Sequence, residues 1–306
     1  MQEFRSNGKI LLTGEYAVLD GAKSLALPTT KGQTLKVDGG EQNLLTWKSY
    51  DEKNKVWFET RFKINEGDFE LEISTQDPDS GKITTRLQQI LKQLFKIHPE
   101  KFITGLDIST HLDFNRNWGL GTSSTLINNL AQWIDTDPYQ LLAETFGGSG
   151  YDIAAAQNDH PITYQLTQKG VSVFTADFNP EFKDELFFVY LNKKQNSREA
   201  IAHYRKQDPT QLQELIDKIS GITEQIIHST NLTEFKMLLQ AHETLISKTI
   251  QLPRIQKQLF PDFNGLVKSL GAWGGDFVLA TGKEKEKEFF RQKGYQDILD
   301  YNELIK

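Results

Sequence analysis

The first third of the chain alternates apolar and polar residues with the period of β-strands. Between residues 56 and 64, apolar positions alternate with mostly polar ones, which predicts a half-buried strand. Apolar runs at 10–12 and 17–19 flank a short polar segment, and Gly39-Gly40 marks a turn. The pattern predicts a β-rich beginning.

Helical spacing of apolar residues begins near residue 84. One apolar face runs through 84–97 and predicts a helix, and a strand over 105–111 follows it. That strand leads to a glycine-rich turn at 119–125, after which apolar residues again recur at helical spacing. We therefore expect a loop that opens directly into a helix.

The next elements carry clear start and stop signals. Asp137 is an N-cap candidate with Pro138 at the first helical position, and the glycines in 147–150 end that helix. A short helix or a turn is expected from 152–156, and 163–174 is predicted to form a pair of strands.

From about residue 186 the chain becomes mainly helical. A buried strand is expected at 187–191, long helices begin near residues 197, 208 and 233, and a helix near Pro261 leads to another glycine cluster and a strand. We place a domain boundary near residue 185, which gives domains 1–184 and 185–306 with a ligand cleft between them.

Composition narrows the function classes. The 35 Lys and Arg against 41 Asp and Glu give a net charge of −6, which argues against a nucleic-acid binder. The chain has no cysteine, which excludes disulfides and thiolate chemistry. We expect a cytoplasmic protein without a membrane segment, because no signal-like or membrane-length apolar run occurs. Oligomeric state is left open.

Glycine clusters carry the candidate chemistry. The turn at 119–125 combines two glycines with four hydroxyl side chains, and a helix N-terminus beyond such a turn suits a phosphate. A plain capped helix explains the same residues. Further clusters lie at 8–14, 147–150 and 271–276, and they match neither a Walker A loop nor a Rossmann fingerprint.

In this order the segments resemble the GHMP kinases, named for galactokinase, homoserine kinase, mevalonate kinase and phosphomevalonate kinase. Residues 8–21 resemble the first motif, 119–125 the phosphate loop usually written Gly-Leu-Gly-Ser-Ser, and 271–276 the third glycine-rich motif. The string Gly-Tyr-Asp-Ile-Ala at 150–154 resembles a bacterial branch recognised by that pentapeptide. The resemblance covers nearly the whole chain.

The resemblance implies a two-domain α+β fold with an active-site cleft between an N-terminal α/β domain and a C-terminal ferredoxin-like domain. It implies ATP and Mg²⁺, and transfer of the γ-phosphoryl group to an alcohol or phosphate oxygen. Such transfer depends mostly on positioning and charge stabilisation.

The resemblance also assigns roles to residues of this chain. Asp152 would orient or deprotonate the acceptor, and Lys9 would lie beside it. Helix capping by Asp152 and a solvated Lys9 are the simpler interpretations. The phosphate-binding residues would be Gly119, Leu120, Gly121, Thr122, Ser123 and Ser124. The metal ligands would be Ser123 and Glu144. The substrate-binding residues would be Glu15, Tyr16, Ser149, Gly150, Ser197 and Arg198. The third glycine motif would be formed by Gly271, Gly274, Gly275 and Asp276.

The chain departs from the family pattern at several positions. Asn7 stands where proline is frequent, and 116–118 replaces the usual small lead-in to the phosphate loop. Trp118 would stack on a nucleotide or simply pack. Trp273 stands where the third motif commonly has glycine. The segment between Glu144 and Asp152 is shorter than in mevalonate kinases.

The acceptor is expected to be phosphomevalonate, narrowly over mevalonate. Tyr16 and Asp276 favour the former, while the string at 25–28 favours the latter. Lys193, Lys194 and Arg198 lie at a predicted helix start and would attract an anionic acceptor, although a solvated basic turn explains them equally well. The same residues leave open a kinase for another small alcohol or sugar, a non-catalytic ligand-binding relative and a decarboxylase relative that phosphorylates transiently.

Overall fold

The computed structural model describes residues 1–65, 68–74, 80–194, 198–271 and 273–306. The chain divides into two compact units, each built from segments that are separate in the sequence. The first unit contains residues 1–8, 31–116 and 121–157, and the second contains 9–30, 117–120 and 158–306. This division differs from a single boundary near residue 185, because strands β1 and β2 each contribute residues to both units.

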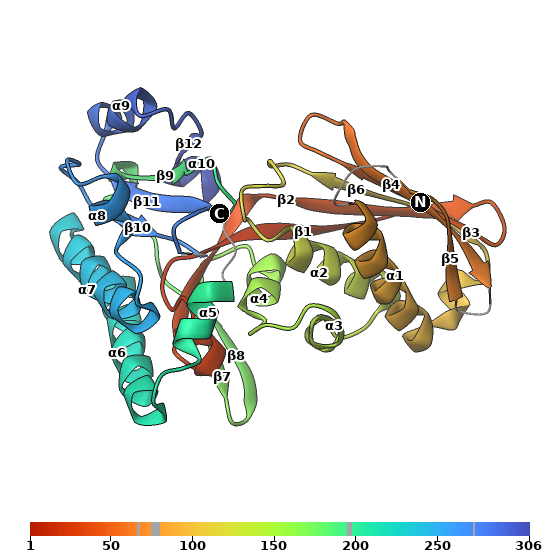
Figure 1. Ribbon diagram of the computed structural model, residues 1–306, viewed down its shortest axis with the longest axis horizontal. Coiled ribbons are helices and arrows are strands. Elements are labelled where there is room, and N and C mark those ends of the chain that lie inside the picture. The colour runs from red at the N-terminus through yellow and green to blue at the C-terminus, as the bar shows by residue number, and fades with distance from the viewer. Residues whose placement is uncertain (66–67, 75–79, 195–197, 272) are drawn as a thin grey trace. The chain divides into compact units, whose positions relative to one another are not determined.

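The first unit is a sheet covered on one face by helices (Figure 1). Its strands follow the order β5-β4-β3-β6-β2, and β1 pairs with β2. The strands are β1 (Gln2–Leu11), β2 (Ser24–Gly40), β3 (Leu44–Tyr50), β4 (Val56–Asn65), β5 (Asp68–Ser74) and β6 (Gly105–Leu112). The helices are α1 (Ser80–Ile97), a 3₁₀ turn (Pro99–Phe102), α2 (Thr122–Ile134), α3 (Pro138–Thr145) and α4 (Tyr151–Gln157).

Alternation along the strands builds the core of this unit. Trp47, Phe58 and Phe62 point to the helices and are at most 2% exposed. They pack with Leu91 of α1 and Leu130 of α2 in one apolar cluster. Burial of this sheet face against helical faces is the main stabilising contribution in the first unit.

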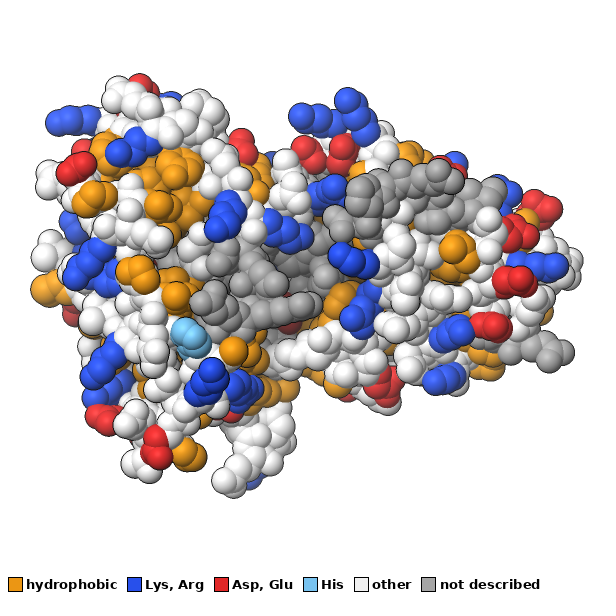
Figure 2. Space-filling model, in the orientation of Figure 1, with side chains coloured by type: hydrophobic (Ala, Val, Ile, Leu, Met, Phe, Trp, Pro, Cys, Tyr) orange, Lys and Arg blue, Asp and Glu red, His pale blue; other side chains and the backbone are white. Residues whose placement is uncertain are grey.

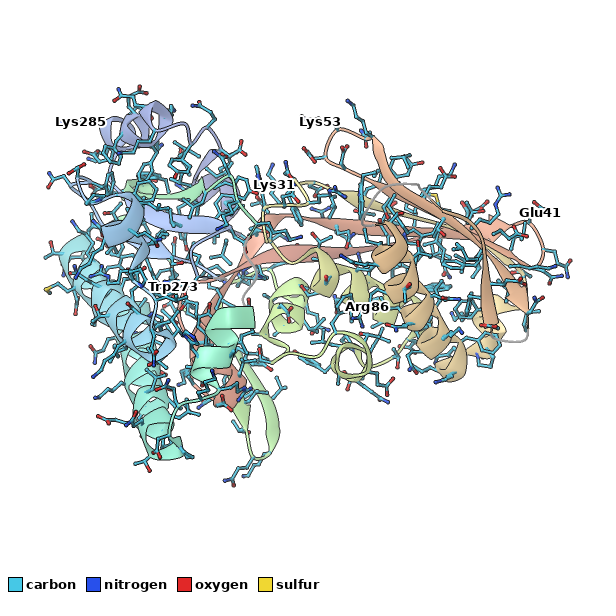
Figure 3. All side chains as sticks on the ribbon, in the orientation of Figure 1. Lys31, Glu41, Lys53, Arg86, Trp273 and Lys285 are labelled. Carbon is cyan, nitrogen blue, oxygen red and sulfur yellow. The ribbon has the colours of Figure 1, made fainter. Side chains whose placement is uncertain are left out.

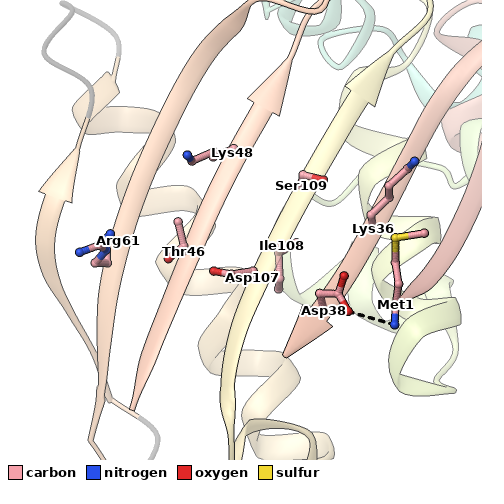
Figure 4. A pocket seen from close by; sticks show the side chains of 9 residues that line it. All are labelled: Met1, Lys36, Asp38, Thr46, Lys48, Arg61, Asp107, Ile108 and Ser109. Atoms are coloured by element: carbon pink, nitrogen blue, oxygen red, sulfur yellow. Dashed lines mark ion pairs between the residues drawn. The ribbon is translucent and has the colours of Figure 1, made fainter. Parts of the chain in front are cut away.

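The opposite face of the same sheet is polar. It carries a shallow hollow of about 440 Å³ lined by Met1, Lys36, Asp38, Thr46, Lys48, Arg61, Asp107, Ile108 and Ser109 (Figure 4). Its charges are largely paired: the N-terminal amine lies 2.9 Å from Asp38, and Lys48 lies 3.3 Å from Glu59. None of the residues predicted for the site lines this hollow, so we interpret it as the solvated face of the sheet.

The second unit contains the N-terminal part of β2, which pairs with β7 (Ile162–Thr167), and β7 in turn pairs with β8 (Gly170–Thr175). It also contains a separate antiparallel sheet in the order β10-β11-β9-β12. These strands are β9 (Leu186–Tyr190), β10 (Val267–Ser269), β11 (Phe277–Thr281) and β12 (Ile298–Asp300).

Helices complete the second unit. They are α5 (Arg198–Tyr204), α6 (Pro209–Ile227), α7 (Leu232–Ile250), α8 (Ile255–Leu259), α9 (Glu284–Gln292) and α10 (Tyr301–Leu304), with 3₁₀ turns at Ala17–Asp20 and Lys183–Glu185. The run of one strand, helices, two strands, a helix and a final strand is the ferredoxin-like arrangement that the resemblance implies. The expected α+β fold class is therefore confirmed.

Most predicted elements are present with shifted ends. The helix expected over 84–97 begins earlier, at Ser80, and Asp137 caps α3 by accepting the Tyr139 N–H at 2.9 Å. The helix expected near Pro261 lies before that proline, as α8, and the short strand β10 leads to the third glycine segment instead. In the ranges that the structure describes, no helix is both long and apolar enough to cross a membrane.

Charge is spread rather than concentrated. On the face drawn in Figure 2, lysines and arginines lie among aspartates and glutamates and form no continuous basic stripe. This mixture of signs is expected from a chain with 35 basic and 41 acidic residues.

Candidate functional site

Helix α2 starts directly at the glycine-rich loop, and no side chain caps it. Its N-cap is Gly121, at φ 97° and ψ 38°, a left-handed conformation that favours glycine. The first helical hydrogen bond runs from the Thr125 N–H to the Gly121 carbonyl at 2.9 Å. The N–H groups of Thr122, Ser123 and Ser124 therefore have no carbonyl acceptor within the helix, and such groups bind anions.

The hydroxyl side chains of the loop divide into two kinds. Those of Ser124 and Thr125 turn back and donate to the Gly121 carbonyl at 2.9 and 3.0 Å, and both residues are buried. Ser123, by contrast, is exposed on the first turn. Two of the four hydroxyls therefore fix the loop, and the exposed hydroxyl of Ser123 can face a ligand or a metal.

A buried polar network holds α2 from below. Ser6 on β1 donates to Asn129 at 2.7 Å and accepts from the Asn128 amide at 2.8 Å. Gln157 at the end of α4 donates to the Asn128 amide oxygen at 3.0 Å. Because Ser6, Asn128 and Asn129 are buried and find partners away from water, and Gln157 adds a contact from the exposed end of α4, the network fixes α2 relative to α4 and β1.

Asp152 lies in the first turn of α4 and is half-buried. Its Oδ1 accepts the Ile153 N–H at 3.1 Å, so it makes a local helix-start contact of the kind the simpler interpretation expects. Gly150 supplies the carbonyl for the first helical bond of α4, from Ala154 at 3.1 Å. Ser149 just before it is half-buried.

Glu144, the second predicted metal ligand, is exposed near the end of α3. Its Oε1 accepts from Gln140 at 3.0 Å. Arg86, labelled in Figure 3, donates to the Thr145 carbonyl at 2.6 Å and lies over the Phe146 ring, which ties the end of α3 to α1. Among the described residues, no group of three or more His, Asp or Glu could hold a metal.

The remaining loop residues belong to the second unit and are held by Lys9. Its ammonium donates to the Gly119 carbonyl at 3.0 Å, and its backbone N–H donates to the Leu120 carbonyl at 2.9 Å. One residue of the first motif thus fixes two successive residues of the phosphate loop. The predicted pairing of Lys9 with Asp152 joins residues of different units and stays a prediction.

The third glycine segment packs against the same loop. Gly119 has φ 70°, and a Cβ on it would come within 2.5 Å of the Asp276 carboxyl group. Asp276 is itself fixed by its backbone, because its N–H donates to the Lys193 carbonyl at 2.8 Å and its carbonyl accepts the Leu191 N–H at 2.8 Å. Gly119 is therefore required by the close approach of Asp276.

Tyr16 occupies a strained turn in the first motif. Its φ of 61° is unusual for a bulky residue, and the Ala17 N–H donates to the Glu15 carbonyl at 2.7 Å across it, as in a γ-turn. The Tyr16 hydroxyl accepts the backbone N–H of Trp273 at 3.1 Å. Burial raises the pKa of Tyr16 to about 12, so the hydroxyl stays protonated.

Trp273 lies in the interior of the second unit and is 4% exposed (Figure 3). Its indole N–H donates to the Pro253 carbonyl at 2.9 Å. The bulky residue in the glycine motif is thus accommodated as a core side chain. Trp118 is likewise a packing residue: its ring meets the Phe277 ring edge-on at 5.5 Å, and its indole N–H donates to Asp297 at 3.3 Å.

A buried charged cluster supports the strained turn. Glu15, predicted to bind substrate, is 1% exposed at its side chain and is bonded to the Lys268 ammonium. His242 accepts the Gly14 N–H through Nε2 at 2.9 Å, and its Nδ1 and the Glu15 Oε2 are buried without hydrogen-bond partners. Glu15 therefore contacts Lys268 in the interior of the second unit, and His242 holds the turn backbone at Gly14.

Burial governs protonation in this cluster. It raises the pKa of Glu15, and the Lys268 charge opposes that shift. It lowers the pKa of His242 well below the usual range, and Lys268 lowers it further. Since Nε2 accepts a hydrogen bond, the histidine is neutral with its proton on Nδ1.

The remaining predicted residues lie in the third glycine segment and at the start of α5. Gly271 and Gly274 have φ of 62° and 85°, and the Gly274 N–H donates to Ser269 at 3.3 Å. Gly275 is buried. Ser197 lies outside the described residues, and Arg198 begins α5.

The sequence pattern did not point to Lys268, His242 or the amides beneath α2. Lys268 carried a usable signal, because a charged residue inside the apolar run 266–270 must be paired if that run is a buried strand. His242 and Asn128 carried none, since their partners come from segments more than a hundred residues away.

Comparisons with known proteins bear on the fold. No model of a protein family matches the sequence, and no curated protein matches it. Among solved structures, the mevalonate kinase of L. major in complex with R-mevalonate has a TM-score of 0.68 at 16% identity, covering 98% of this chain and 95% of that one. The phosphomevalonate kinase of Streptococcus pneumoniae, with phosphomevalonate and AMPPNP, has a TM-score of 0.66 at 14% identity, covering 96% of each chain.

The galactokinase of Lactococcus lactis, complexed with galactose, has a TM-score of 0.65 at 16% identity and covers 95% of this chain and 88% of that one. The chain has the fold of the GHMP kinases. These three solved structures are kinases of different small molecules. The shared fold therefore does not identify the substrate of this chain.

We predict that Lys268→Met destabilises the protein strongly. It leaves the Glu15 carboxylate buried without its cation, and the free energy of unfolding should fall by about 3–5 kcal/mol. Urea unfolding measures this. Lys285→Met on α9, an exposed site labelled in Figure 3, should change stability by less than about 0.5 kcal/mol.

The double variant Glu15→Leu with Lys268→Met should recover most of that loss, because a buried pair replaced by apolar side chains is often nearly neutral. Equal stability of Lys268→Met and the native chain would contradict the ion pair.

We also predict acid sensitivity that depends on His242. The unfolded chain takes up a proton near the ordinary histidine pKa of about 6.5, whereas the folded chain does so only at much lower pH. Stability therefore falls as pH drops below that value, by about 1.4 kcal/mol per pH unit.

His242→Gln keeps an acceptor for the Gly14 N–H and should lose much of this slope. The midpoints of urea unfolding, measured at about pH 7.5 and about pH 5.5, test this loss of pH dependence. The exposed His160→Gln is the control and should keep the native slope. An unchanged slope in His242→Gln would refute the assignment.

Proposed function

We propose that this protein is an ATP-dependent kinase that transfers the γ-phosphoryl group to a small anionic acceptor, and that the acceptor is phosphomevalonate. The observation that carries the proposal is the uncapped N-terminus of α2, where three N–H groups follow a left-handed glycine. This end of the helix fits a phosphate group by hydrogen bonding and by the sign of the helix dipole.

The donor set also fits Mg²⁺. An exposed serine hydroxyl on the first turn and an exposed glutamate are oxygen ligands, and Mg²⁺ typically keeps several waters and binds substrate phosphates beside one or two protein ligands. We propose Ser123 as one metal ligand and Glu144 as the second.

In this proposal, Asp152 accepts the proton of the acceptor oxygen, and Lys9 stabilises negative charge on the transferring group. The contacts of Lys9 with the carbonyls of 119 and 120 support a role in setting the loop as well. The likeness to kinases of small alcohols and phosphates at TM-scores of 0.65 to 0.68 supports the reaction class.

Phosphomevalonate is favoured over mevalonate by cationic side chains near the third glycine segment. Lys193 and Lys194 are exposed, and the Lys193 carbonyl holds the Asp276 N–H. An acceptor that already carries a phosphate uses such cations better than one with a carboxylate alone. Mevalonate is the second candidate, and the specific bacterial branch named by the pentapeptide belongs to the same proposal.

We predict that Asp152→Asn lowers kcat by about 10²–10⁴-fold, because the amide cannot accept the acceptor proton. A coupled assay of ADP release with ATP, Mg²⁺ and phosphomevalonate measures it. Lys9→Met should also lower kcat. Asp135→Asn, at an exposed helix end, is the matched control and should keep native turnover. Native turnover in Asp152→Asn would remove its catalytic role.

The acceptor is tested by running phosphomevalonate, mevalonate, galactose and homoserine in parallel in the same assay. We expect phosphomevalonate to give the highest kcat/KM. A higher kcat/KM for mevalonate would contradict the proposed acceptor but would leave the proposed kinase activity in place. Failure of every acceptor, together with no ATP binding by calorimetry, would contradict the kinase proposal itself.

A further inference from the structure

Strand β8 is a sheet edge that lacks the usual protection. It ends the strand order of the large sheet and pairs with β7 alone among the described strands. Its six residues, Gly170–Thr175, include no charged side chain and no proline, and its ladder with β7 has no bulge. Proteins normally blunt an exposed edge with one of these devices.

The other terminal strands that the structure describes are protected. Strand β1, which pairs with β2 outside the main order, carries Glu3, Arg5 and Lys9. The opposite end of the same order, β5, carries Asp68, Glu70 and Glu72, and its ladder with β4 is irregular near Phe62. The end strands of the second sheet, β10 and β12, have three residues each. The lack of protection is therefore specific to β8.

Apolar side chains on β8 are exposed as well. Phe174 is 69% exposed and Val171 is 42% exposed. In Figure 1 the hairpin β7–β8 extends away from the body of the second unit, with its turn at the free end. A neutral strand with open backbone groups and exposed apolar side chains is a template for another strand.

The ladder with β7 shows which backbone groups point outward. The Ala176 N–H donates to the Pro161 carbonyl at 2.8 Å, and bonded pairs alternate along an antiparallel ladder. Phe174, Ser172 and Gly170 therefore bond to β7, whereas the N–H and C=O groups of 171, 173 and 175 point away from it. These outward groups repeat symmetrically about Val173.

We propose that β8 is the contact between two copies of this chain, paired antiparallel about a twofold axis at Val173. In this register Val173 faces its own copy and Val171 faces Thr175, so every outward group of 171, 173 and 175 finds a partner. The two Phe174 rings lie on one face as diagonal neighbours, which is within reach of aromatic side chains.

Charge at the ends of the strand fits the same register. Lys169 in the hairpin turn comes opposite Asp177 of the other copy, and both are exposed. Each end of the seam therefore brings together one positive and one negative charge. The contact is short, so the dimer is weak and forms at micromolar concentration or above.

Sedimentation at high micromolar concentration tests the contact. The native chain should sediment at twice its mass of 35.0 kDa. Val173→Lys places two ammonium groups face to face and should shift the protein to monomer with an unchanged circular dichroism spectrum. Met237→Lys, an exposed apolar residue on α7, adds the same charge elsewhere and should remain dimeric.

Cysteine cross-linking tests the register, because the chain has no cysteine of its own. Val173→Cys should form a disulfide-linked dimer under mild oxidation. Val171→Cys should not, since its two copies are offset by four residues, roughly 14 Å along the strand. Adding Thr175→Cys to Val171→Cys should restore the cross-link. A monomeric native chain, a dimer that survives Val173→Lys, or equal cross-linking of the two single variants would each overturn the proposal.

Discussion

The structure depends on one local constraint, which is that helix α2 begins without a side-chain cap. A helix usually satisfies its first N–H groups with a serine, threonine or aspartate oxygen. Here the N-cap is a left-handed glycine, and the nearby hydroxyls of Ser124 and Thr125 donate to its carbonyl instead. The open N–H groups would cost stability unless water or an anion met them, so the surrounding structure must hold the helix in place by other contacts.

Within each unit, a different chemistry fixes the residues that belong to that unit. In the first unit, neutral groups of Ser6, Asn128, Asn129 and Gln157 form a satisfied network beneath α2. In the second unit, the Lys9 ammonium donates a hydrogen bond to the Gly119 carbonyl. The buried Glu15–Lys268 pair lies at the turn that follows β1. Neutral networks tolerate a change of pH, whereas the charged cluster makes the first motif sensitive to it.

The elements that could be predicted from the sequence are those that depend on a local residue pattern. Strand β4, helix α1 and the Asp137 cap follow from alternation, apolar spacing and a proline at the helix start. The division into units could not be predicted, because it depends on β1 and β2 running through both units. Glu15 shows a similar limit for the site. Its substrate-binding role stays a prediction, and its buried partner Lys268 lies 253 residues away, so the pairing could not be predicted from the sequence.

A neighbouring side chain, as well as the turn, explains why position 119 is a glycine. Gly119 is fixed by the Asp276 carboxyl, which occupies the place of its missing side chain, and Asp276 is in turn fixed by the backbone of Lys193. The phosphate loop is therefore continuous, through packing, with the segment that carries the exposed lysines. A side chain at position 119 would therefore have to displace either the Asp276 carboxyl or the loop backbone, because the packed interior leaves no room for both.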